Sequence, residues 1–209
     1  SNNSITLTAD NNIINGSIIN LPISFSSSNG YQSQNSTMIQ VGITQITDPL
    51  GPDSHGYYIY DMNDVDYELA PDYNWIEIDP DYGGNGSEID LYDNGNNGDD
   101  VTTINLPFTF TFYGINYDEV SVCSNGWISF GQTDMESFRN YTLPGPGGPP
   151  AMVAVFWDDL LTTGGGDVFT YYNPLNDTFI VEWSDVRTFF NNTSESFQVI
   201  LYNTNLQTV

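Results

Sequence analysis

Hydrophobic and polar residues alternate with a period of two along much of this chain. In the segment PFTFTFYG, Phe108, Phe110 and Phe112 fall on one face, while the intervening threonines and Tyr113 fall on the other. This alternation is typical of a half-buried antiparallel strand. Short segments with similar patterning lie between clusters of Gly, Pro, Asn or Asp, and they cover residues 38–46, 73–78, 120–123, 127–130, 151–157, 168–172, 178–183 and 196–202.

The same pattern indicates the fold class. No window of about a dozen residues keeps the 3.6-residue period of an amphipathic helix. A parallel sheet needs crossover connections, usually helices, whereas antiparallel strands need only short turns. The sequence therefore predicts an all-β fold in which short antiparallel strands form a β-sandwich.

Two breaks rich in proline and glycine organise the chain. The first, TDPLGPD, predicts a linker between an N-terminal portion, residues 1–47, and a main body, residues 48–209. The second, LPGPGGPP, covers residues 143–150 and leads directly into the most apolar strand. We expect this second break to be a rigid crossover between the two sheets and not a domain boundary.

Charge removes two classes of partner. The 209 residues include 27 Asp or Glu but only two Lys or Arg, Arg139 and Arg187, and the formal net charge is -25. Binding to nucleic acid or to an anionic membrane surface needs a basic patch, so we expect neither. No apolar run of about 18 residues is present, so direct membrane insertion is not expected either. An aromatic fraction of 14% nevertheless predicts a buried core.

The acidic residues are concentrated in turn-like stretches between Asp48 and Asp100. This part of the chain holds 12 Asp and three Glu without a Lys or Arg, interleaved with Asn and Gly. Ca²⁺ takes about six to eight oxygen ligands from carboxylates, amides and backbone carbonyls on flexible loops. The density of like charge therefore predicts Ca²⁺ as a structural cofactor. Solvated turns explain the same composition, because Asp, Asn and Gly all tolerate tight turns.

Residues 79–90 resemble a calcium loop in their spacing. Asp79, Asp81 and Asp90 occupy positions 1, 3 and 12 of a twelve-residue loop, with Gly84 at position 6. The preceding segment alternates like a strand, and Asp90 replaces the bidentate Glu of an EF-hand. We therefore expect an irregular loop site here and not an EF-hand.

Two further stretches contribute candidate metal ligands. The first is DNGNNGDD, and the second is WDDL with the TTGGGD loop that follows it, from which the last Asp is placed to return toward the acidic pair. Hydrogen bonding within the turns is the structural alternative for these side chains. The candidate ligands from both stretches are Asp93, Asn97, Asp99, Asp100, Asp158, Asp159 and Asp167.

Catalysis is not expected. Cys123 and His55 are the only residues of their types, and they form a nucleophile and base only if the fold brings them together. Cys123 sits in the alternating segment VSVCSNGW, where a buried, inert thiol is favoured. Glycoside hydrolysis uses a pair of carboxylates at a defined separation, but such pairs occur by chance among 27 acids. Their presence in the sequence therefore does not indicate a glycoside hydrolase. We expect Arg139 and Arg187 to pair with carboxylates inside the fold.

Several ordered motifs of the main body resemble the nidogen-like β module of extracellular proteins. They are FTFYGINYDEVSVCSNGWISFG, AMVAVFWDDL, GGGDVFTYYN, FIVEWSDV and SFQVILYN. Together with DPLGPDSHGYYIYD and APDYNWIEI, they resemble more closely a non-catalytic module that accompanies gingipain-like cysteine peptidases and other large secreted or surface proteins of bacteria. The resemblance covers about residues 48–202 and implies a nidogen-like, jelly-roll-like sandwich. Residues 1–46 resemble the last strands of an immunoglobulin-like domain.

The resemblance implies a secreted or cell-surface module that serves adhesion, assembly or substrate presentation. Its partners would be other domains or copies of the same protein, or an extracellular protein or glycan. One alternative is a carbohydrate-binding accessory domain of a secreted peptidase or glycan-degrading enzyme, with exposed tyrosines such as Tyr58 and Tyr60 stacking on sugar rings. Another is a subunit of an extracellular fibre, assembled by strand addition at an open sheet edge near residues 4–27 or 196–209.

Overall fold

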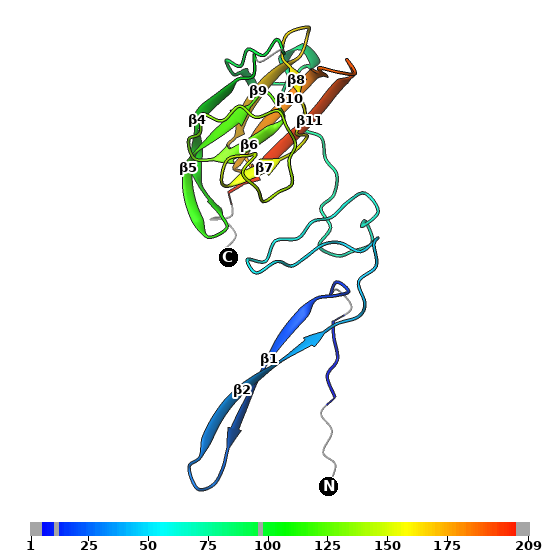
Figure 1. Ribbon diagram of the computed structural model, residues 1–209, viewed down its shortest axis with the longest axis vertical. Helices are drawn as coiled ribbons and strands as arrows, with labels where there is room; N and C mark the ends of the chain where they lie inside the picture. Colours follow the sequence, from blue (N-terminus) through cyan, green and yellow to red (C-terminus); the bar gives the residue numbers. More distant parts are fainter. Residues whose placement is uncertain (1–5, 11–12, 96–97, 204–209) are drawn as a thin grey trace. The chain divides into compact units, whose positions relative to one another are not determined.

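The computed structural model describes residues 6–10, 13–95 and 98–203, and it divides the chain into two compact units. The first unit is Ser1–Asn74 and the second is Trp75–Val209 (Figure 1). The stretch expected to be a linker, residues 47–53, lies inside the first unit.

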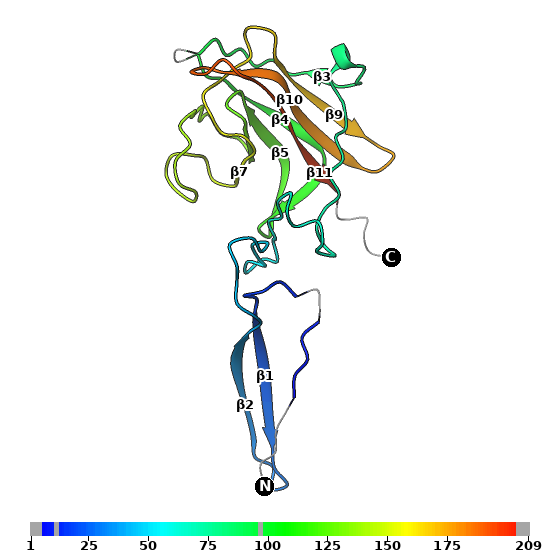
Figure 2. The same cartoon turned by 90° about the vertical axis from the view of Figure 1, so that its right-hand side faces the viewer.

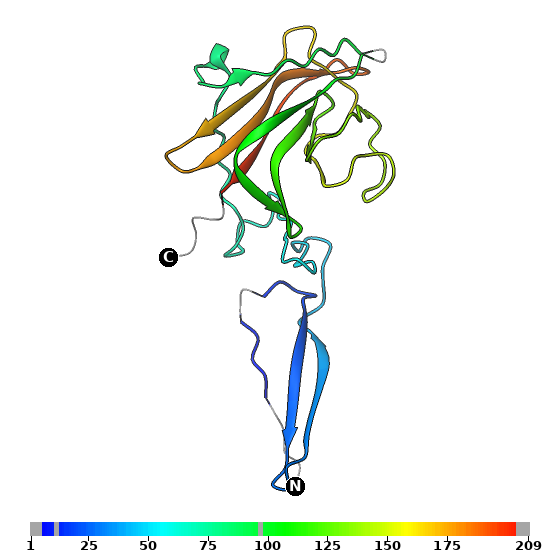
Figure 3. The same cartoon turned by 90° about the vertical axis from the view of Figure 1, so that its left-hand side faces the viewer.

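The described part of the first unit contains a β-hairpin. Strands β1 (Ile18–Ser26) and β2 (Gln32–Gln40) pair antiparallel and form a two-stranded sheet, which Figure 3 shows as a twisted ribbon. The turn between them contains Gly30 with a positive φ of 88°, and the Ser27 amide closes it by donating to the carbonyl of Tyr31. The strand predicted over residues 38–46 is therefore only partly correct, because β2 ends at Gln40 and the pattern missed β1.

The second unit confirms the predicted all-β, antiparallel architecture. One sheet has the order β4-β5-β6-β7, and the other has the order β11-β10-β9-β3, with β8 pairing β10. Figure 2 shows β4 and β5 in one layer and β9 and β10 in the other. A 3-10 turn η1 (Pro80–Tyr82) is present, and no α-helix occurs in the described part of the chain. The strands are β3 (Ser87–Glu88), β4 (Val101–Phe112), β5 (Ile115–Cys123), β6 (Trp127–Phe130), β7 (Met152–Ala154), β8 (Leu160–Leu161), β9 (Asp167–Asn173), β10 (Thr178–Thr188) and β11 (Ser194–Tyr202).

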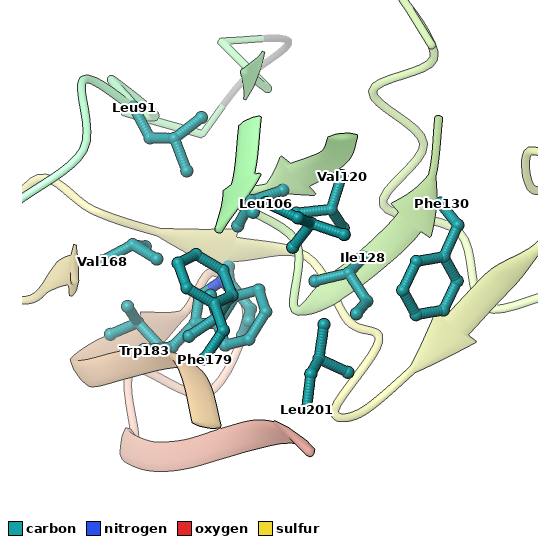
Figure 4. Packing of buried hydrophobic residues seen from close by; sticks show 13 residues of the cluster. Leu91, Leu106, Val120, Ile128, Phe130, Val168, Phe179, Trp183 and Leu201 are labelled. Carbon is teal, nitrogen blue, oxygen red and sulfur yellow. The ribbon is translucent and has the colours of Figure 1, made fainter. Parts of the chain in front are cut away.

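The hydrophobic core lies between these two sheets. The alternation predicted for β4 is confirmed, because Phe108, Phe110 and Phe112 pack against the core while the threonines between them are exposed. Figure 4 shows Trp183 and Phe179 of β10 facing residues of the other sheet, including Val120 and Ile128. Burial of these large side chains is the main force that holds the sandwich together.

A long loop, residues 131–151, joins β6 to β7. The expectation that LPGPGGPP crosses between sheets is wrong, because β6 and β7 are antiparallel neighbours in one sheet, with Trp127 opposite Ala154. The loop instead covers a second apolar cluster, where the indole nitrogens of Trp127 and Trp157 both donate to the carbonyl of Ser137 at 2.9 and 2.8 Å. Among the described residues, no helix is long and apolar enough to cross a membrane.

Candidate functional site

Acidic side chains gather at the end of the sandwich where β5 turns into β6. The turn is formed by Ser124, Asn125 and Gly126, and the first two residues are completely buried. Gly126 has a φ of 75°, and a Cβ there would come within 2.0 Å of the carbonyl oxygen of Phe156, so the turn needs glycine. This tight turn places two polar side chains inside the end of the fold.

Asp93 is one of the acids that these side chains hold. Its carboxylate has no solvent exposure and accepts hydrogen bonds from Ser124 Oγ at 2.6 Å and from the Gly95 amide at 2.7 Å. The Asp93 amide donates to Thr162 Oγ1 at 2.8 Å, which ties this loop to the residue after β8. Burial, followed by the nearby charges of Asp99 and Asp100, raises the pKa of Asp93.

Asn125 joins three further segments at the same place. Its Nδ2 donates to Asp99 Oδ1 at 2.8 Å and to the carbonyl of Glu136 at 3.3 Å. Its Oδ1 accepts from the Leu160 amide at 2.9 Å. One buried amide therefore positions an acidic loop, the long loop after β6 and the start of β8.

Asp158 and Asp159 reach the same group from the segment before β8. Asp159 is only 8% exposed, and its amide donates to Asp158 Oδ1 at 2.8 Å. Burial, followed by the charges of Asp99, Asp93 and Asp158, raises the pKa of Asp159 to about 6, and no hydrogen-bond donor lowers it. Sites of this kind favour a cation, because a buried carboxylate without a donor is costly to ionise.

We call Asp93, Asp99, Asp100, Asp158 and Asp159 the end cluster. All five were expected as metal ligands from the sequence, and in the structure the acids of the two stretches, residues 93–100 and residues 157–160, lie near one another. Asp100 is already engaged, because its Oδ2 accepts the Tyr92 amide at 2.9 Å. In the described part of the chain, no three Asp, Glu, His or Cys side chains form a ready-made metal-ligand set.

The other expected ligands lie elsewhere. Asp79 is the N-cap of η1 and accepts the Asp81 amide at 2.8 Å, as an ordinary Asx turn does. Burial, followed by the charges of Asp79 and Asp81, raises the pKa of Asp167, so Asp167 lies near these two residues and not beside Asp159. Asp90 is exposed, and Asn97 lies outside the described residues.

Sequence reasoning missed the uncharged side chains that build this end of the sandwich. Ser124 and Asn125 occur in the motif SNGW, but only their buried position shows that they hold the acids. Glu136 was also missed, although desolvation and the charges of Asp100 and Asp99 raise its pKa. A polar pair followed by glycine between two strands is the one sequence signal that could have suggested such a turn.

The remaining chemical candidates lie outside the end cluster. Cys123 is completely buried, and burial raises its pKa to about 12, which agrees with the expected inert thiol. Arg187 donates to Asn192 Oδ1 at 3.2 Å, and Arg139 lies 5.3 Å from the ring centre of Phe138. These contacts are with uncharged groups, in contrast to the expected pairing with carboxylates.

Two of the tyrosines considered for sugar stacking, Tyr58 and Tyr60, belong to the first unit. Tyr58 and Tyr60 lie on the same side of the chain, as residues two apart in an extended segment do. Their rings stack on each other with centroids 5.9 Å apart. The carbohydrate-binding alternative stays a prediction.

Comparison with known proteins gives a family for the second unit. A family model described as NIDO related matches residues 82–207, which is more than half of the chain. No curated protein and no solved structure matches the sequence. The association with gingipain-like peptidases and the immunoglobulin-like character of residues 1–46 stay predictions. Its motifs, its sandwich and this match together show that the chain belongs to the NIDO-related family of nidogen-like modules, which are of a non-catalytic, extracellular type.

Proposed function

We propose that this chain is part of a larger secreted or cell-surface protein and serves adhesion, assembly or substrate presentation, with Ca²⁺ bound at the end cluster to stabilise it. The observation that carries the calcium proposal is Asp159, a carboxyl that is 8% exposed, lies among Asp93, Asp99 and Asp158, and has no hydrogen-bond donor acting on its pKa. A divalent cation would supply the missing positive charge.

Calcium suits this position better than magnesium. The acids come from loops and from the segment before β8, and such supports adjust to the longer and less regular Ca²⁺ coordination. Asp99, Asp158 and Asp159 do not form a ready-made ligand set, so their side chains would move together to bind the ion. Asn125 would hold Asp99 in place through its 2.8 Å hydrogen bond. Magnesium demands near-octahedral geometry and gives up its water reluctantly.

The test is the thermal midpoint of the full chain in chelator, in millimolar Ca²⁺ and in millimolar Mg²⁺, at one moderate ionic strength. Holding the salt constant separates specific binding from screening of the net charge of -25. We expect Ca²⁺ to raise the midpoint by several degrees more than Mg²⁺ does, because a ligand that binds only the folded state stabilises it.

Matched variants locate the effect. Asp159→Asn should abolish the gain from Ca²⁺, whereas Asp90→Asn, at an exposed loop position, should keep it. Equal gains from Ca²⁺ and Mg²⁺, or a full calcium response in Asp159→Asn, would contradict the proposal. In that case, the end cluster is not a calcium site.

A second candidate function, assembly by strand addition, is favoured by the hairpin of the first unit. Among the described residues its sheet consists of β1 and β2, and Met38 in β2 is 77% exposed. Short sheets with open edges are templates for pairing with another chain, and a charged residue on such a strand blocks this pairing. Light scattering over a concentration series should show self-association that Met38→Lys abolishes and Leu175→Lys, at a 94% exposed position of the second unit, leaves unchanged. A monomer at all concentrations would exclude assembly of this chain with itself.

A further inference from the structure

Residues 75–79 lie across the outer face of the sheet that contains β9, β10 and β11, and we call them the strap. Ile76 and Ile78 of the strap pack against Ile180 of β10 and its apolar neighbours. A side chain of the sheet also holds the strap backbone, because Gln198 Oε1 accepts the Ile76 amide at 3.2 Å and Gln198 Nε2 donates to the Ile76 carbonyl at 3.1 Å. Side chains of the sheet therefore make the hydrogen bonds to Ile76 that backbone groups would make to a neighbouring strand.

Glu182 of β10 lies beneath the strap and is only 1% exposed. Its Oε2 accepts the Ile78 amide at 3.2 Å and Gln198 Nε2 at 3.4 Å. Its Oε1 is buried and has no hydrogen-bond partner among the described residues. A buried carboxylate oxygen without a donor is costly, so the arrangement lacks one positive or donating group.

Glu77 of the strap is the neighbour that can complete this arrangement. Its Oε1 accepts the Asp79 amide at 2.8 Å and its Oε2 accepts Trp75 Nε1 at 3.2 Å, so both oxygens of Glu77 act as hydrogen-bond acceptors. The side chains of Glu182 and Glu77 are within hydrogen-bonding reach of each other. Two ionised carboxylates repel at this distance, whereas a protonated carboxyl donates to a carboxylate in a strong hydrogen bond.

We propose that a proton on Glu182, donated to Glu77, fastens the strap to the sheet, and that loss of this proton loosens the strap. With the proton on Oε1, this atom of Glu182, otherwise unpartnered among the described residues, becomes a hydrogen-bond donor to Glu77. Without the proton, the negative charges of the buried Glu182 and the partly buried Glu77 repel each other. The strap then opens, and the cluster around Ile180 becomes accessible to solvent.

A divalent cation suits this position less well than a proton. Both oxygens of Glu77 and one oxygen of Glu182 already accept N–H donors, so Oε1 of Glu182 is the single acceptor left over in the pair. Calcium needs about six to eight oxygens. A proton needs only one oxygen to bind to, and Oε1 of Glu182 provides it.

No cation competes for this role among the neighbours of Glu182. The residues opposite it in the adjoining strands are Phe169 of β9 and Gln198 of β11, and neither of them ionises. Glu88 of β3 lies one strand further away, opposite Phe169. The charged groups that act on Glu182 are Glu77 and Asp79, and both favour its protonated form.

The direction of the pH dependence follows from this environment. Burial first, and then Glu77 and Asp79, raise the pKa of Glu182 from 4.5 to about 7, although the Ile78 amide lowers it. Between these two values the folded protein keeps a proton that the unfolded chain releases, so the strap is most stable at pH 4.5 and below. Its stability is lost progressively as the pH rises through about 7.

Hydrogen exchange of the full chain tests the proposal. The experiment is done in chelator, so that its result does not depend on calcium, and exchange is expressed as protection factors to remove the intrinsic effect of pH. We expect protection of residues 75–79 to fall roughly 10- to 100-fold between pH 5 and pH 8 in the wild type. In Glu182→Gln the neutral amide donates to Glu77 at every pH, so the protection should no longer change.

Two further variants and one spectroscopic measurement complete the test. Glu77→Gln should weaken the pH dependence without removing it, because burial and Asp79 still raise the pKa of Glu182 when the charge of Glu77 is gone. Glu119→Gln, at an exposed position of β5, should behave as the wild type does. Carbon-13 NMR of glutamate carboxyls in the wild type should show one group that titrates near neutral pH. Absence of that group, or an unchanged pH dependence in Glu182→Gln, would overturn the proposal.

Discussion

Ser124 and Asp93 are joined by a 2.6 Å hydrogen bond in which the serine hydroxyl donates to a carboxylate that has no solvent exposure. Ser124 belongs to the turn between β5 and β6, while Asp93 lies in the loop before β4 and is also bound to Thr162 after β8. The bond therefore connects parts of both sheets at one end of the sandwich. Uncharged side chains hold the acids in position, so the concentration of negative charge in the end cluster depends on neutral residues.

Asn125→Ala should destabilise the second unit strongly. The substitution removes three hydrogen bonds made by a completely buried side chain, and it leaves the Leu160 amide without its acceptor. Because each buried polar group left without a partner costs about 1 to 3 kcal/mol, we expect a loss of about 2 to 4 kcal/mol. Urea unfolding followed by circular dichroism measures it, with the exposed Asn140→Ala expected within about 0.5 kcal/mol of the wild type.

Gly126→Ala and Gly114→Ala form a matched pair of backbone variants. Both glycines have a positive φ, 75° and 77°, but a Cβ meets the carbonyl oxygen of Phe156 at 2.0 Å only at position 126. At position 114 nothing lies within 4 Å of the Cβ, so that variant measures the cost of the left-handed conformation alone, about 1 kcal/mol. We expect at least about 3 kcal/mol for Gly126→Ala by the same unfolding assay. Equal losses would show that the turn moves away from Phe156 without cost.

The alternation of apolar and polar residues predicted the central strands well. It was less successful for segments whose backbone does not pair with another strand. The segment 127–130 was predicted with the bounds that β6 has, because its apolar run lies between two glycine turns. Residues 73–78 alternate like a strand, but there the structure has the strap, whose Ile76 pairs with the side chain of Gln198 and not with a strand backbone. The two-residue strands β3 and β8 are too short to carry a period.

The candidate site was predicted in its residue types and not in its grouping. The acid-rich turns pointed to Asp93 and Asp99 in one stretch and to Asp159 with Asp167 in another, whereas in the structure Asp159 lies near Asp93 and Asp99 and Asp167 lies near Asp79 and Asp81. Distance along the chain gave no information on these neighbours, and whether any of the residues binds a metal stays a prediction. Glu182 gave no signal at all, since a single acid in an apolar strand shows its role only through burial. Burial and tertiary contact determine these properties, and neither is visible in local sequence.

Cys123 should resist thiol reagents in the folded protein. The side chain has no solvent exposure, and burial raises its pKa from 9.0 to about 12, so the reactive thiolate is almost absent at pH 8. We expect alkylation with iodoacetamide at pH 8 to be roughly a thousandfold slower in the native protein than in concentrated guanidinium. Rapid native labelling, measured by mass spectrometry, would show that β5 opens readily or that the thiol is a reactive group.

Trp183 should be one of the most sensitive positions of the core. It is completely buried in β10, its ring stacks on Phe197 at a centroid distance of 5.0 Å, and its Nε1 donates to the carbonyl of Cys123 in the opposite sheet at 3.0 Å. Trp183→Phe keeps most of the apolar volume and loses the hydrogen bond between the sheets, so we expect a loss of about 1 to 3 kcal/mol.

Trp183→Ala also opens a cavity, and we expect its cost to reach about 4 kcal/mol or more. Urea unfolding followed by circular dichroism measures both variants, with Phe190→Ala as the control because Phe190 is 77% exposed. The control should lie within about 0.5 kcal/mol of the wild type. If Trp183→Ala were as mild as the control, the two sheets would not close around this indole, and the packing that positions the end cluster and the strap would have to come from other residues.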